Sequence, residues 1–120
     1  MQTGLFLQVG GDYMTQISIR ERNEFFDICM IGHAETGEYG KDIVCAALSA
    51  FAYVLREVFR VLQEEGKLPG PEMELRPGLV RMKVPIPKEA EHTVRTVIHA
   101  VIRNIQALQR QYPQAVKLSN

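Results

Sequence analysis

A cysteine and a histidine lie on either side of a glycine-rich segment in the first half of the chain. Cys45 falls near the start of a helix-forming run that we expect to open at Asp42, and His33 closes an apolar run. With Asp42 as N-cap, Cys45 would take the third helical position, where free backbone N–H groups and the helix dipole stabilise a thiolate. A nearby histidine could exchange protons with that thiol, and the same N–H groups could hold an oxyanion. The pattern indicates nucleophilic catalysis by Cys45 with His33.

The two residues have less specific interpretations as well. A single cysteine near a helix start is more often a small buried apolar residue, and a histidine at a strand end is more often structural or solvated. Ser49, one turn after Cys45, could face the site or fill a tight contact between helix and sheet. Asp42 could cap the helix or turn away and orient His33 as the third member of a triad. The residues alone leave these alternatives open.

Other reactive side chains give weaker signals. Cys29 lies in a predicted strand and is interpreted as packing; a zinc site with Cys29, His33 and Cys45 has only three ligands at irregular spacing. We expect two histidines of the last helix to be solvated or interfacial, and two tyrosines to line a groove or, more commonly, the core: His92, His99, Tyr39 and Tyr53. No metal or cofactor is expected.

The elements that must position Cys45 and His33 follow from hydrophobic periodicity. We expect strands over residues 15–20 and 25–31, a helix over 42–65, a hairpin around 73–75 and 80–84, and a helix over 88–112. Residues 32–40 contain three glycines and predict a mobile loop. The order β-β-α-β-β-α predicts an α+β two-layer sandwich, with both helices on one face of a four-stranded antiparallel or mixed sheet.

Composition limits the class of protein. The 120 residues suffice for one domain, predicted over 14–120, while residues 1–13 are interpreted as a flexible arm or an upstream start. A segment that docks on the site or on a partner is the alternative for 1–13. The net charge of +0 gives no case for nucleic acid or a membrane as partner. Two cysteines and a poor signal sequence favour a cytoplasmic location.

The segment around both candidate residues resembles a known family. Its elements are Gly32-His33-Ala34, then Tyr39-Gly40, then Asp42-Ile43-Val44-Cys45-Ala46-Ala47, with Ser49 and Ala50 after them. This arrangement is similar to the signature of the ribosomal-processing cysteine proteases known as Prp. The resemblance covers about residues 15–118, and the 13 leading residues depart from it.

The resemblance implies a function and partners. Members of the family are small homodimers that cleave a short N-terminal extension from a large-subunit ribosomal protein, the twenty-seventh in the usual count. It implies that Cys45 is the nucleophile and His33 the general base or acid. It also implies that the loop with Gly32, Ala34, Gly37, Tyr39 and Gly40 admits the peptide. The rival hypothesis is a non-catalytic α+β module that binds a ribosomal component.

Overall fold

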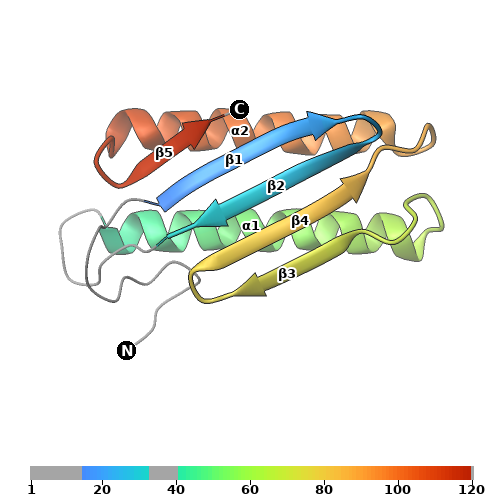
Figure 1. Cartoon of the computed structure of the whole chain (residues 1–120), viewed down its shortest axis with the longest axis horizontal. Helices are drawn as coiled ribbons and strands as arrows, with labels where there is room; N and C mark the ends of the chain where they lie inside the picture. The colour runs from blue at the N-terminus through green and yellow to red at the C-terminus, as the bar shows by residue number, and fades with distance from the viewer. Residues whose placement is uncertain (1–14, 33–40, 120) are drawn as a thin grey trace.

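Five strands and two helices make up the part of the chain that the computed structural model describes, residues 15–32 and 41–119. The elements are β1 (Thr15–Arg22), β2 (Phe25–Ile31), α1 (Lys41–Glu64), β3 (Glu72–Arg76), β4 (Leu79–Pro85), α2 (Glu91–Gln111) and β5 (Val116–Ser119). The sheet forms one layer and both helices cover the same face of it (Figure 1). The α+β sandwich is therefore confirmed. The predicted arm, residues 1–13, lies outside the described residues.

The sheet is mixed and has one strand more than predicted. Its order is β3-β4-β2-β1-β5, and every neighbouring pair is antiparallel except β1 with β5, which is parallel. The prediction of four strands was wrong because β5 has only four residues, too few for alternation to stand out after Pro113. The backbone N–H of Thr15 donates to the carbonyl of Ala115 at 2.9 Å, which ties β5 to the start of β1.

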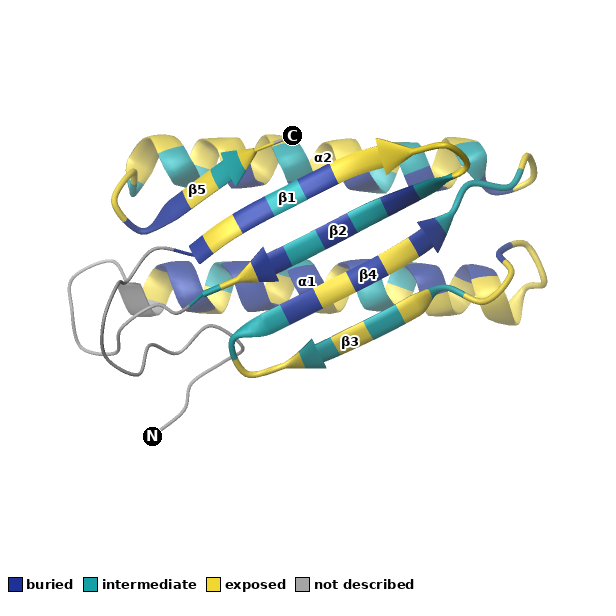
Figure 2. Cartoon of the chain, viewed as in Figure 1, coloured by how far each residue is buried: buried dark blue, intermediate teal, exposed yellow. Residues whose placement is uncertain are grey.

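One face of the sheet is apolar and packs on the helices. Along β1, β2 and β4 buried residues alternate with more exposed ones (Figure 2). Since successive side chains of a strand point to opposite faces, one set of alternate residues lines the core. The set comprises Ile17, Ile19, Phe26, Ile28, Met30, Val80, Met82 and Val84. The opposite face is left uncovered by either helix (Figure 1).

Helix α1 ends where the sequence predicted a stop. Gly66 has φ +74°, a left-handed conformation that glycine adopts without strain. The N–H of Gly66 donates to the carbonyl of Gln63 at 3.0 Å, and the N–H of Lys67 to that of Leu62 at 2.9 Å. These two bonds form a Schellman motif, and Leu68, the next residue, is buried in the core. No helix in residues 41–119 is long and apolar enough to span a membrane.

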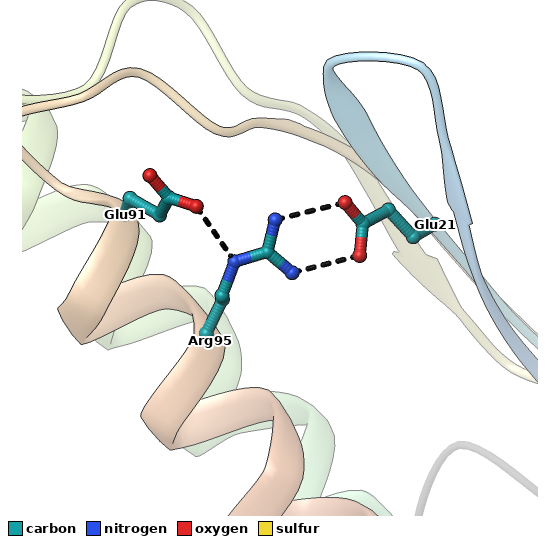
Figure 3. A network of polar contacts seen from close by, with 3 residues as sticks. All are labelled: Glu21, Glu91 and Arg95. Atoms are coloured by element: carbon teal, nitrogen blue, oxygen red, sulfur yellow. Dashed lines mark hydrogen bonds and ion pairs between the residues drawn. The ribbon is translucent and has the colours of Figure 1, made fainter.

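Helix α2 is joined to the end of β1 by a charged cluster. Arg95 donates to both carboxylate oxygens of Glu21, at 2.7 and 2.8 Å, and to Glu91 at 2.9 Å (Figure 3). Its guanidinium also lies 5.6 Å from the ring centroid of Phe26. The hydrogen bond from Arg95 holds the pKa of the Glu21 carboxyl below its usual value. The end of β1 and the start of α2 lie at the opposite end of the sandwich from the start of α1 (Figure 1).

Candidate active site

Cys45 stands one turn inside α1. Because the helix begins at Lys41, Cys45 is its fifth residue rather than its third, and Asp42 is already helical rather than the residue before the helix. The unpaired N–H groups of a first turn therefore precede Cys45 in the chain. The side chain of Asp42 lies outside what the structure describes, so its two roles, capping or orienting His33, remain predictions.

The thiol of Cys45 is buried. Its residue is only 1% exposed and belongs to the core, between Val44 and Leu48, which are both fully buried. Cys45 thus joins the buried side of α1, and residues 33–40, which the thiol would face in a loop-side site, lie outside the described part. A peptide therefore reaches this thiol only when the groups that cover it move.

Strand β2 ends at Ile31, two residues before His33. Gly32 follows the strand with φ +134°, a conformation that residues with a side chain rarely adopt, and its N–H donates to the carbonyl of Gly78 at 3.2 Å. This hydrogen bond holds the backbone that follows β2 beside the turn between β3 and β4. The end of β2 and the start of α1 lie at the same end of the sandwich (Figure 1). The predicted loop residues His33, Ala34, Gly37, Tyr39 and Gly40 lie outside the described part.

Ser49 lies one turn beyond Cys45 on the same side of α1. It is 6% exposed, one of two polar residues among the buried ones that the structure describes. Residues four apart on a helix are neighbours, so Ser49 is close to Cys45 along the helix surface. Burial agrees with a tight contact between helix and sheet and also with a role beside the thiol, so both interpretations of Ser49 stay open.

Cys29 and Cys45 do not share a site. Cys29 alternates with buried Ile28 and Met30, so it points to the open face of the sheet, whereas Cys45 lies between sheet and helix. This excludes the three-residue zinc site, and no metal-binding group of histidine, cysteine or carboxylate side chains occurs in residues 15–32 and 41–119. Cys29 is half-buried in a groove of about 570 Å³ on the open face rather than packed in the core.

Two histidines and one tyrosine named in the sequence analysis lie on the helices, and all three are exposed. His92 and His99 are exposed on α2, as expected. Tyr53 is 40% exposed, and its ring receives the Arg56 guanidinium at 4.9 Å, so it is not a core residue. All three side chains therefore lie at the surface, whereas Cys45 is buried.

A buried hydroxyl near the same end of the sheet was missed. Thr15 is fully buried, and its Oγ1 has no hydrogen-bond partner in the described structure. It shares the helix-facing side of β1 with Ile17, and β1 begins at the end of the sandwich where α1 also begins (Figure 1). Threonine at a strand start is common, and only burial without a partner marks this one. The sequence offered no signal for it.

The matched span of the chain decides its family. The sequence profile of the family described as "Cysteine protease Prp" matches residues 14–117, which include Cys45, strands β1 to β4 and the start of β5. The chain belongs to the cysteine protease Prp family. Two curated relatives, both named ribosomal processing cysteine protease Prp and both from Staphylococcus aureus, are 46% identical to it over 37 residues. That alignment covers 31% of this chain and only 35% of each relative.

Solved structures of Prp and of a similar protein have the same fold. The chain matches SMU.848 from Streptococcus mutans with a TM-score of 0.63 and 27% identity, covering 88% of this chain and 92% of that one. It matches the ribosomal processing protease Prp of S. aureus, solved with a substrate peptide, with a TM-score of 0.64 and 19% identity, covering 88% and 96%. At that identity the S. aureus Prp structure supports the fold of this chain and not the roles of its residues.

Proposed function

We propose that this chain is a cysteine endopeptidase that removes a short N-terminal extension from a large-subunit ribosomal protein, the twenty-seventh. The observation that carries the proposal is the convergence of Cys45, near the start of α1, and the end of β2 at one end of a Prp fold. His33 follows that strand after a single glycine. The S. aureus relative was solved with a substrate peptide, which supports a peptide as ligand of this fold.

The proposed reaction is acyl transfer through Cys45. The thiol gives its proton to His33, and the sulfur attacks the carbonyl carbon of the scissile peptide bond. Backbone N–H groups of the first turn of α1 stabilise the oxyanion of the tetrahedral intermediate. His33 then protonates the leaving amine as the C–N bond breaks. Water hydrolyses the thioester, which restores the thiol and releases the leader peptide. The residues in this scheme require no metal or cofactor.

Burial of Cys45 adds one step before this chemistry. A side chain that is 1% exposed cannot meet a carbonyl carbon, so the groups that cover the thiol of Cys45 must move as the peptide binds. The proposed enzyme is therefore closed in the absence of its substrate. We further propose that it works as a homodimer in the cytoplasm, where the ribosomal substrate is found.

The same burial favours a second candidate function, a non-catalytic module that binds a ribosomal component. In that case Cys45 is a packing residue of the core, as its full burial beside Val44 and Leu48 would suggest. The two functions differ in whether the thiol ever becomes reactive. A binding module keeps Cys45 inert with or without its partner.

Cleavage of the ribosomal protein separates the two functions. The full chain is incubated with the purified ribosomal protein carrying its extension, and products are identified by mass spectrometry. Wild type should release the extension, and Cys45→Ala should release none. Cys29→Ala is the matched control, since it removes the other cysteine from the opposite face of the sheet and should cleave at the wild-type rate. Cleavage by Cys45→Ala within tenfold of wild type would refute the nucleophile, and binding without cleavage by wild type would favour the module.

A further inference from the structure

Strand β3 is an edge strand of the sheet, and a proline lies on each side of it. It pairs only with β4, so one side of Glu72–Arg76 has no neighbouring strand in the described structure. Pro71 precedes the strand and Pro77 follows it. Proline has no N–H to donate to a neighbouring strand, so further pairing at this edge is confined to the five residues between the two prolines.

The free backbone groups of this edge belong to two residues. The hairpin has a two-residue turn, Pro77-Gly78, in which Arg76 faces Leu79. In such a hairpin the flanking pair is hydrogen-bonded and the next pair along is not. Arg76, Glu74 and Glu72 therefore direct their backbone groups to β4. Met73 and Leu75 direct theirs outward, to the open edge.

We propose that a second copy of this chain pairs with β3 along this edge, antiparallel and centred on Glu74, so that the two sheets become one continuous ten-stranded sheet. In this register Met73 of each copy faces Leu75 of the other, and both pairs exchange N–H···O=C bonds. Centring the pairing on Met73 or on Leu75 would instead place Pro71 or Pro77 where a donor is needed. The prolines thus permit one register. The proposal specifies the interface of the homodimer in the proposed function and rests on it.

The side chains of β3 are complementary to themselves in that register. On the open face of the sheet, Glu72 of each copy faces Arg76 of the other, which gives two opposite-charge pairs. On the helix side, half-buried Met73 and Leu75 meet and extend the core. Glu74 faces its own copy at the centre, but Arg76 Nε donates to its carboxylate at 2.9 Å and Arg81 faces it on β4, so positive charge surrounds the pair.

The other edge of the sheet lacks this complementarity. The only charged residue of β5 is Lys117, so antiparallel pairing of two β5 strands would form no pair of opposite charges. The distribution of exposed apolar side chains also favours the β3 edge. Five large apolar residues of the described chain are at least 40% exposed, and four of them lie on α1: Ile43, Tyr53, Val54 and Val61. Helix α1 lies on the β3 side of the helical layer, and α2 on the β5 side (Figure 1).

The test uses two charge-reversal variants. Each should dimerise weakly with itself, and the two should form a heterodimer with each other. Glu72→Arg makes both positions positive, and Arg76→Glu makes both negative, so each variant should dimerise about 10- to 100-fold more weakly than wild type. In an equimolar mixture, the two positive positions of one chain face the two negative positions of the other, and heterodimers should form at the wild-type affinity. Sedimentation velocity gives the masses, and native mass spectrometry of chains with different tags identifies the heterodimer. Arg110→Glu, on the exposed end of α2, is the control and should dimerise normally.

Each outcome has one meaning. Weak dimers of both single variants and a restored heterodimer support pairing at β3. Dimers of undiminished affinity in the single variants overturn the β3 interface and leave the homodimer itself intact. If both single variants dimerise weakly and mixing them does not restore the affinity, the β3 interface is also overturned. The loss of affinity would then have a cause other than repulsion between like charges. A monomeric wild type at micromolar concentration overturns both the interface and the homodimer of the proposed function, while the cleavage assay still reports on the protease.

Discussion

Replacing Cys45 by serine or by alanine separates its burial from its proposed chemistry. Both substitutions remove the thiol, so both should abolish cleavage. They differ in what they leave in the core, since Cys45 is 1% exposed and its neighbours Val44 and Leu48 are fully buried. Alanine leaves a methyl group and a small void, whereas serine leaves a hydroxyl that water cannot reach.

The magnitude follows from the cost of burying a hydroxyl. Burial without a hydrogen bond costs about 1–3 kcal/mol in proteins. A helical serine can bond the carbonyl four residues earlier, here that of Lys41, which moves the expected cost towards the lower limit. Alanine also has the higher helix propensity, by up to about 0.5 kcal/mol. We therefore expect Cys45→Ser to be about 1–3 kcal/mol less stable than Cys45→Ala.

The assay is urea unfolding followed by circular dichroism, with midpoint and slope compared between variants. Cys29→Ser and Cys29→Ala are the matched pair on the open face, where the side chain is half-buried and the two variants should agree within about 0.5 kcal/mol. Equal stability of the two Cys45 variants would show that this side chain reaches water or a polar partner. It would refute the reasoning that the surroundings of Cys45 are both apolar and closed to water.

Three further predictions concern other residues. His33→Ala should slow cleavage about 10²–10⁴-fold, as positioned acid–base groups usually contribute that much; a rate within threefold of wild type in single-turnover cleavage would exclude it from proton transfer. Glu21→Gln should lower Tm at pH 7, because Arg95 holds the pKa of Glu21 below its usual value and the ion pair stabilises the folded state at any pH above the pKa of an unfolded glutamate. The difference in Tm should vanish as acid protonates Glu21 in both states, and a difference that persists at pH 2 would refute the electrostatic origin. Thr15→Val should raise the free energy of unfolding by about 1 kcal/mol, since it replaces a buried hydroxyl without a partner by a methyl group; a loss of stability in urea unfolding would show that this hydroxyl is bonded.

Most of the fold could be predicted because its elements carry strong periodic signals. The alternation of Ile17 and Ile19 along β1 and the stripe of α2 identify elements that face the core, and both are buried as expected. Gly66 and the Pro77-Gly78 pair mark a helix end and a turn, and both glycines have positive φ. Such signals are local, so sequence alone reveals them. β5 is four residues long and is stabilised by pairing with β1, which is a tertiary effect that no local pattern reports.

The site was harder to predict than the fold. The sequence indicated which residues could react, but not whether each would be buried between sheet and helices or lie on the open face of the sheet. Cys45 lies beneath the sheet, and Cys29, in a strand of apolar neighbours, points to the open face. Alternate residues of a strand point to opposite faces. Because Ile28 and Met30 face the core, this alternation alone would have placed Cys29 on the open face. The depth of Cys45 depends on the packing of α1 against the sheet, which periodicity around the helix fixes only to within about one position.

Burial of Cys45, the proposed nucleophile, fits the proposed cleavage of one peptide bond. If the open form made up about one molecule in a hundred, opening would cost about 2.7 kcal/mol, and the apparent affinity for any peptide would fall about a hundredfold. A peptide whose contacts repay that cost over many residues would still be cleaved, while short or mismatched sequences would not. Because the thiol is buried in this form, it would also resist oxidation until substrate arrives. The same packing that makes Cys45 resemble an ordinary core residue can thus give the proposed enzyme its selectivity.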